Sequence, residues 1–115
     1  MMALADNSKN LRIDPGGRLS GETKLGNGTW SRHTIDLHPK FGNDDGRFDI
    51  KGSNFAWGAE NLRMDGTTLR AKLKNRARDF VEASIDLGRI LKVKDGEFVF
   101  LSEFVYCLLL CGEDL

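Results

Sequence analysis

The sequence predicts an all-β protein made of two tandem copies of one unit of about fifty residues, with short helical turns between the strands. Three observations lead to this prediction. The segment SIDLGRILKVKDGEF at 84–98 repeats the frame of TIDLHPKFGNDDGRF at 34–48. Apolar and charged residues alternate with a period of two along 69–74. In each copy an Asp-Gly pair follows the IDL motif, where it is the strongest short-range signal for a β-hairpin turn.

The duplication covers most of the chain. NLRID at 10–14 corresponds to NLRMD at 61–65, Leu19 to Leu69 and Lys24 to Lys74. Two copies are too few for a solenoid, which needs three or more units, so we expect the copies to pack on each other. We place a single module at 1–103, with repeat 1 at about 5–53, repeat 2 at about 54–103, and an apolar tail at 104–115 outside the repeat.

Each copy reads as strands joined by turns. The residues expected to face the core are Leu69, Ala71 and Leu73 in repeat 2, and Leu19, Gly21 and Thr23 in repeat 1. Hairpin turns are expected at Asp45-Gly46 and Asp95-Gly96, because both residue types tolerate positive φ. DPGG at 14–17 and DGTT at 65–68 predict two more turns. Ser53 or Asn54 is the expected N-cap of a short helical turn at the junction of the copies.

Composition excludes several classes of function. Lys plus Arg equals Asp plus Glu at 17 each, so the whole molecule has no net field to attract nucleic acid or an acidic membrane. The start, MMALADNSKN, lacks the apolar stretch of a secretory signal, and we expect a cytoplasmic protein. Cys107 and Cys111 lie four residues apart near the end and cannot cross-link the body. Their spacing from His33 and His38 indicates no zinc cluster, so we expect no metal and no cofactor.

These residues resemble the cyanovirin-N homology family of lectins. The resemblance runs from about Ala5 to Phe100 and rests on the tandem repeat and on IDL followed eight residues later by DG in both copies. SNF at 53–55 and LKNRARDFV at 73–81 add to it. It implies an elongated, pseudo-symmetric module in which each repeat has a three-stranded sheet and a hairpin, with the hairpins exchanged between repeats. It also implies binding of mannose-rich glycans without catalysis. We expect a monomer, with a domain-swapped dimer as the alternative.

The resemblance places sugar pockets at the two far ends of the module. The central pocket, formed by the middle of the chain, carries over onto Asn43, Asp44, Asp45, Ser53, Asn54, Gly58, Lys74, Asn75, Arg76 and Arg78. The terminal pocket has three parts: the N-terminal segment near Ala3 to Asn7 with Asp6 and Asn7, then Lys24 with Gly26, and the second hairpin at Val93, Lys94 and Asp95. Val93 stands where the first hairpin has Asn43 and cannot form hydrogen bonds through its side chain. We therefore expect the central pocket to bind better and the terminal pocket to be weak or lost.

The chain also departs from the family pattern. The family's founding member has a disulfide in each repeat, and the equivalent positions here are Ser8 with Thr23 and Ala59 with Leu73, which cannot form one. Apolar packing is expected to replace the covalent link.

The residue types at the central end suit a sugar. A hexose presents vicinal hydroxyls that each donate and accept, so its pocket needs amides and carboxylates side by side. Asn43, Asp45 and Asn54 supply such groups, and Arg76 can donate along two parallel directions. Trp57 has no aromatic counterpart in repeat 1, where Asp6 stands, and is the candidate for a ligand-facing aromatic ring. Trp30 and Phe80 occupy matching positions and are expected in the core.

Three other functions remain open from the residues alone. Arg70, Lys72, Lys74, Arg76 and Arg78 would form a basic stripe on one face if the strand extends that far, and such a stripe could bind nucleic acid or sulfated glycans. An enzyme is disfavoured because Asp44 and Asp45 simply adjoin, without the separated pair of carboxylates that a glycosidase uses. The last alternative is a scaffold of this family whose sugar pockets have been lost.

Overall fold

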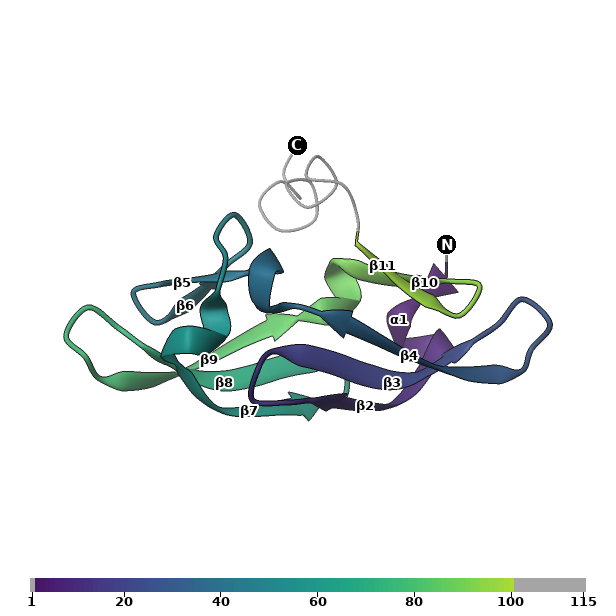
Figure 1. The fold of residues 1–115 in the computed structure, drawn as a ribbon, viewed down its shortest axis with the longest axis horizontal. Coiled ribbons are helices and arrows are strands. Elements are labelled where there is room, and N and C mark those ends of the chain that lie inside the picture. Colours follow the sequence, from purple (N-terminus) through teal and green to yellow (C-terminus); the bar gives the residue numbers. More distant parts are fainter. Residues whose placement is uncertain (1, 101–115) are drawn as a thin grey trace.

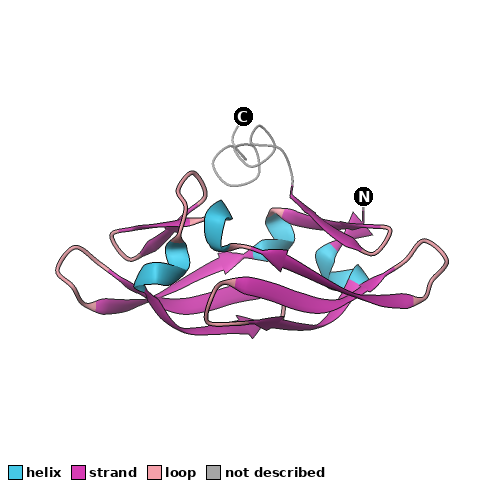
Figure 2. Cartoon of the chain, viewed as in Figure 1, coloured by secondary structure: helices cyan, strands magenta, loops and turns pink. Residues whose placement is uncertain are grey.

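The structure, a computed structural model of the chain, describes residues 2–100 and shows the same succession of elements twice (Figures 1 and 2). The elements of the first half are β1 (Met2–Ala3), α1 (Leu4–Asn7), β2 (Ser8–Ile13), β3 (Arg18–Lys24), β4 (Trp30–Asp36), η1 (His38–Lys40), β5 (Gly42–Asp44) and β6 (Arg47–Asp49). Those of the second half are η2 (Phe55–Gly58), β7 (Ala59–Asp65), β8 (Thr68–Lys74), β9 (Phe80–Asp86), η3 (Leu87–Arg89), β10 (Leu91–Lys94) and β11 (Glu97–Phe100). The all-β prediction is confirmed.

Each half contains a three-stranded antiparallel sheet with the same register. The strand orders are β2-β3-β4 and β7-β8-β9. Leu19 pairs with Ile35 in the first sheet, and Leu69 pairs with Ile85 in the second. The first two strands of each sheet carry a bulge, at which Asn10 and Asn61 both have a φ of 56°. The sequence duplication is therefore a structural duplication, including its irregularities.

The alternating residues face the core as expected. Leu69, Ala71 and Leu73 are fully buried on β8, and Leu19 and Thr23 are fully buried on β3. Strand side chains alternate between faces, so the intervening charged residues lie on the solvent side of each sheet. Ser8 pairs with Thr23 and Ala59 with Leu73 in the ladders, so the positions of the missing disulfides face each other directly.

Two hairpins complete the fold. The first is β5-β6, and the second is β10-β11, to which β1 adds a third strand. Asp45 and Gly46 have φ values of 53° and 86°, and Asp95 and Gly96 have 46° and 83°. These left-handed values at both central residues are those of a type I′ turn, so both Asp-Gly hairpin predictions are confirmed.

Each hairpin packs against the sheet of the other repeat (Figure 1). In the second hairpin, the amide of Phe98 donates to Nδ1 of His33 on β4 at 3.3 Å, and the Thr23 hydroxyl on β3 donates to the Gly96 carbonyl. In the first hairpin, the side-chain amide of Asn43 donates to the Lys74 carbonyl at the end of β8 over 2.8 Å. These contacts join segments that lie 31 to 73 residues apart in one chain.

One apolar core runs through both halves. It includes the following fully buried side chains: Leu4, Leu19, Leu37, Phe41, Phe55, Leu69, Leu73, Leu87, Ile90, Leu91 and Val93. Phe41, Phe48 and Phe55 form an aromatic cluster with centroid separations of 5.5 to 6.4 Å. The module is elongated, with principal extents of 50 × 35 × 20 Å. Its hairpin turns and the turns after β3 and β8 lie at the two ends of the long axis (Figure 1).

The prediction that Trp30 and Phe80 lie in the core is wrong. Trp30 is 38% exposed and Phe80 41% exposed, each at the start of the last strand of its sheet. They pair with Lys24 and Lys74 on the solvent face, and the ammonium groups of these lysines lie 5.8 and 5.4 Å from the ring centroids. Each lysine lies over part of the apolar ring surface, so the ring is partly shielded from water without being buried in the core.

No helix within residues 2–100 is long and apolar enough to cross a membrane. The apolar tail at 104–115 lies outside the described residues.

Candidate functional site

The turn after β8 gives the central end a fixed backbone. The amide of Asn75 donates to the Asp79 carbonyl at 2.9 Å, and the amide of Arg78 donates to the Asn75 carbonyl at 3.0 Å. The Asn75 side-chain oxygen accepts from the Asp79 amide at 3.0 Å. Arg78 itself adopts a φ of 68°. Asn75 therefore shapes the turn, and its side-chain oxygen is already engaged.

Two side chains of the first hairpin connect it to this turn. Asn43 accepts from the Gly46 amide at 2.8 Å while donating to the Lys74 carbonyl. One carboxylate oxygen of Asp45, Oδ1, accepts from the Arg76 amide at 2.8 Å. The other oxygen of Asp45 has no hydrogen bond to residues 2–100 and retains its capacity to accept. Asn43 and Asp45 thus position the loops against each other.

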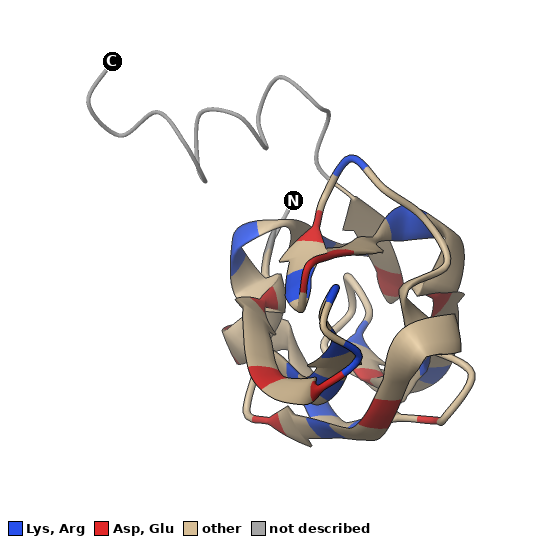
Figure 3. Ribbon diagram, turned by 90° about the vertical axis from the view of Figure 1, so that its left-hand side faces the viewer, with Lys and Arg blue, Asp and Glu red and all other residues tan. Residues whose placement is uncertain are grey.

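Asp44 and Arg76 form a polar pair at the tip. Their carboxylate and guanidinium lie 3.5 Å apart, and their side chains are 67% and 81% exposed. An exposed pair of this kind contributes little to stability, about 0 to 1 kcal/mol. It does place an acceptor beside several donors in open solvent. Figure 3 looks onto this end and shows basic and acidic segments close together around it.

The junction between repeats supplies further polar groups. Asn54 occupies the N-cap position of η2 with a φ of 64°, but its side chain makes no cap hydrogen bond. Its backbone amide donates to the His38 carbonyl at 2.7 Å, which fixes the residue while leaving the side-chain amide without a partner in residues 2–100. Ser53 is exposed beside it. A Cβ added at Gly58 would lie 3.4 Å from Nδ2 of Asn43 and 3.9 Å from Cβ of Lys74, so η2 ends directly beside the hairpin and β8.

Trp57 is the most exposed aromatic side chain of the described residues, at 81%. Its ring contacts the ring of His38 edge to face, with the two centroids 5.3 Å apart at an interplanar angle of 60°. Nδ1 of His38 also accepts from the Ala56 amide at 3.2 Å. Sequence reasoning did not find the role of His38 in orienting η2, because nothing local connects it to a segment 18 residues later.

The terminal end repeats part of this arrangement. Oδ1 of Asp95 accepts from the Gly26 amide at 2.9 Å, the counterpart of the contact between Asp45 and Arg76. Val93, by contrast, is fully buried in β10 and pairs with β1. It packs in the core where the other hairpin presents an amide.

The remaining residues expected at the terminal end are less connected. The Asn7 side chain donates to the Ala3 carbonyl at 2.8 Å within its own helical turn. Asp6 and Lys94 are exposed, and the Lys24 ammonium lies toward Trp30 on the sheet face. The structure brings together Gly26 and Asp95, but shows no hydrogen bond or ion pair between residues Asp6, Lys24 and Lys94 in the part of the chain it describes.

The basic stripe expected over Arg70 to Arg78 does not form. β8 ends at Lys74, and Arg78 takes a left-handed conformation in the following turn, so the alternation of faces stops. Arg70 is paired with Asp65 at 3.1 Å, and Arg76 with Asp44. The five cations therefore share no single face, and two of them are neutralised.

No group of three or more His, Cys, Asp or Glu residues that could hold a metal ion occurs within residues 2–100.

Comparison with known proteins agrees with the fold and the repeat. The family model described as the CVNH domain matches residues 5–99. The cyanovirin-N homolog of Neurospora crassa is 31% identical over 78 residues, which are 62% of this chain and 70% of that protein. The solved structure of the CVNH protein of Gibberella zeae is 34% identical, covers 84% of this chain and 95% of its own, and has a TM-score of 0.73.

A designed cyanovirin-N homolog lectin, solved by NMR, is 30% identical, with 87% of this chain and 100% of its own covered and a TM-score of 0.77. The matched region covers every strand from β2 to β10 and all but the last residue of β11. The chain therefore belongs to the CVNH domain family.

Proposed function

We propose that this protein is a non-catalytic, carbohydrate-binding protein that takes mannose-type glycans at its central end. The observation that carries the proposal is the convergence of three segments there: the first hairpin, the turn after β8, and η2. Membership of the CVNH family supports it, and so does the designed relative, which is described as a lectin.

The chemistry of the central end matches a polyhydroxylated ligand. Asp44 and the free oxygen of Asp45 accept hydrogen bonds, while Arg76 donates several, so neighbouring hydroxyls of one hexose can be engaged at once. The uncommitted amide of Asn54 both donates and accepts. Trp57 offers an exposed ring on which the apolar face of a sugar can rest. Mannose is the sugar that the family resemblance implies.

The terminal end is proposed to be weak or inactive. Val93 is buried in the core and offers a ligand no hydrogen bond, and no ion pair like that of Asp44 with Arg76 occurs at the terminal tip within residues 2–100. Asn7 is already engaged by its own turn. The protein is proposed to act as a monomer, in which each hairpin covers the sheet of the other repeat of the same chain.

The test is an NMR titration of the protein with α1-2-linked mannobiose. We expect amide shifts to cluster at 43–46, 54–58 and 75–78. Arg76→Gln should weaken binding by about tenfold, because it removes a charge-assisted donor. The matched control is Lys94→Gln, which removes an exposed cation from the other end and should leave affinity unchanged.

The outcomes discriminate between the alternatives. Shifts confined to 93–96 would reverse the ranking of the two ends. A complete absence of shifts with mannobiose, together with an intact fold, would favour another sugar or a scaffold that has lost its pockets.

A further inference from the structure

The solvent face of the β2-β3-β4 sheet contains a depression that is separate from both ends. Its volume is about 330 Å³, and it is lined by Asn10, Arg12, Ser20, Gly21, Glu22 and Arg32. This volume lies at the lower end of the range for small-molecule pockets and can hold about one monosaccharide unit. Every lining side chain is polar, and Gly21 contributes only its backbone.

Two arginines flank this depression. Arg12 on β2 pairs with Ser20, and Arg32 on β4 pairs with Glu22, so they stand on either side of β3. Two strand spacings and a stagger of two residues along β3 separate their backbones by about 12 Å, a span that two arginine side chains can close. Neither guanidinium forms an ion pair with any of residues 2–100, and both side chains are exposed. The depression therefore has two uncommitted cationic donors.

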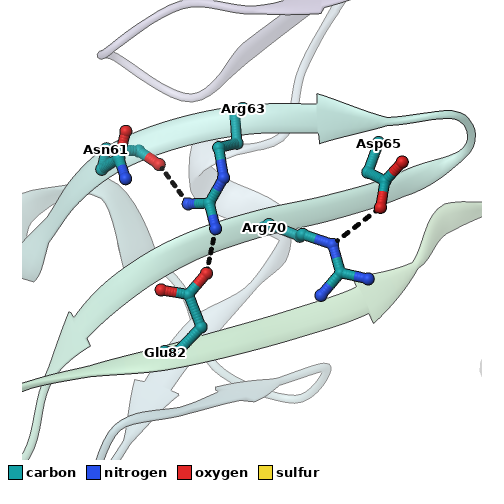
Figure 4. Close-up of polar contacts among 5 residues, drawn as sticks. All are labelled: Asn61, Arg63, Asp65, Arg70 and Glu82. Atoms are coloured by element: carbon teal, nitrogen blue, oxygen red, sulfur yellow. Dashed lines mark hydrogen bonds and ion pairs between the residues drawn. The ribbon is translucent and has the colours of Figure 1, made fainter.

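The second repeat shows how such a face is neutralised (Figure 4). There Arg63, the counterpart of Arg12, forms an ion pair with Glu82 and donates to the Asn61 carbonyl at 3.0 Å. Glu82 occupies the position that Arg32 occupies in repeat 1. In repeat 1 the carboxylate stands instead on the middle strand, as Glu22 where repeat 2 has Lys72, and Arg32 takes the place of Glu82. The charge of the three positions is the same, but in repeat 1 the two arginines flank the carboxylate and neither forms an ion pair within residues 2–100.

The remaining groups suit a sugar. Glu22 accepts from the Asn10 side chain at 2.6 Å and has further lone pairs for a hydroxyl, and Ser20 shares a hydrogen bond with Thr34 at 3.2 Å. Trp30 lies two residues before Arg32 on the same face of β4, about 6 to 7 Å along the strand. Its ring is partly exposed, with the Lys9 ammonium 4.3 Å from the ring centroid. A partly exposed indole ring with a lysine over it, two guanidiniums and a carboxylate thus lie on one surface.

We propose that this face is a second binding site, which takes an acidic saccharide, one that carries a carboxylate or sulfate group. Arg12 and Arg32 hold the anionic group with charge-assisted hydrogen bonds. Glu22 and Ser20 bind ring hydroxyls, and Trp30 with Lys9 extends the site to a neighbouring unit. The site is independent of the mannose site proposed at the central end.

The test measures binding of a heparin tetrasaccharide to the full chain by calorimetry at low salt. Arg32→Glu installs the residue that repeat 2 has at this position, and we expect it to weaken binding by about tenfold or more. Arg70→Glu is the matched control: it makes the same change in net charge on the solvent face of the other sheet, and affinity should change less than about twofold. In the wild type, amide shifts should fall at 20–22 and 30–32.

Three results would contradict the proposed site. Equal losses in both variants would show a non-specific field, and an unchanged affinity in Arg32→Glu would exclude the site. Equally tight binding of single-stranded DNA would show that the site recognises anionic charge and does not select a saccharide. The mannobiose titration, repeated on Arg32→Glu, should retain its shifts at the central end, so failure of one site is distinguishable from failure of the other.

Discussion

Asn43 and Val93 occupy equivalent positions in the two hairpins, but their side chains have different roles. Asn43 connects its hairpin to the Lys74 carbonyl and to Gly46, whereas Val93 fills the core. The sequence predicted only that the Val93 side chain forms no hydrogen bond, because an amide and an aliphatic side chain are distinguishable by type alone. It could not predict that both polar atoms of Asn43 would be used in holding the hairpin, since one partner lies 31 residues away.

Gly46 allows a residue-scale prediction about the first hairpin. Its φ is 86°, and a Cβ there would collide with Cγ2 of Val81, a stiff β-branched side chain on β9. We expect Gly46→Ala to lower the free energy of unfolding by about 2 to 4 kcal/mol, from backbone strain and overpacking together. Urea denaturation monitored by circular dichroism measures this change.

The control for this prediction is Gly28→Ala. Gly28 has a φ of 87° and no atom within 4 Å of an added Cβ, so it isolates the backbone term, about 1 to 2 kcal/mol. Equal losses in the two variants would contradict the packing of the hairpin against β9.

At the scale of elements, alternation and turn residues predicted the strands and hairpins, and the structure shows where those signals stop. Cations continue at every second position to Arg78, but the strand ends at Lys74 because Asn75 and Asp79 form a hydrogen-bonded turn. A period-two pattern cannot reveal that end, since the turn has no Gly or Pro to mark it. Trp30 departs from its prediction for a related reason: an indole ring favours the core by residue type, but the lysine opposite it in the ladder lies near its ring on the solvent face.

His33 provides a prediction for the second hairpin. It accepts from the Phe98 amide, and their rings lie 5.3 Å apart. His33→Ala should leave this amide without its acceptor and destabilise the hairpin by about 1 to 2 kcal/mol. Hydrogen exchange followed by NMR should show faster exchange of the amide of Phe98.

His38→Ala is the appropriate comparison, because His38 also accepts through Nδ1 but holds η2. It should leave the exchange of the Phe98 amide unchanged. Unchanged exchange in His33→Ala itself would show that the contact does not secure the hairpin.

For the whole molecule, the decisive feature is that each half is completed by the other. The hairpin that covers one sheet comes from the opposite repeat, joined by contacts such as Thr23 to Gly96 across 73 residues. The residues alone predicted two repeats packed on each other, but local patterns do not say which hairpin covers which sheet. Only the family resemblance supplied that arrangement, because hydrogen bonds over such distances leave no signature in spacing.

This arrangement predicts that the two repeats unfold together. In a urea series, amide signals of β3 and β8 should disappear with the same midpoint, since loss of either sheet removes the packing partner of a hairpin from the other. Gly46→Ala should lower both midpoints equally. Two separate transitions, one for each sheet, would show that the repeats are independently stable.

The 50 Å length of the module has a consequence for how it would act on a glycoprotein. Its two tips face opposite directions, too far apart for one short oligosaccharide branch to reach both. With Val93 buried in the terminal hairpin, the mannose site is proposed at the central tip alone. On that proposal, each molecule would hold one mannose-type glycan and form soluble complexes with it, instead of bridging neighbouring mannose chains into a precipitating lattice.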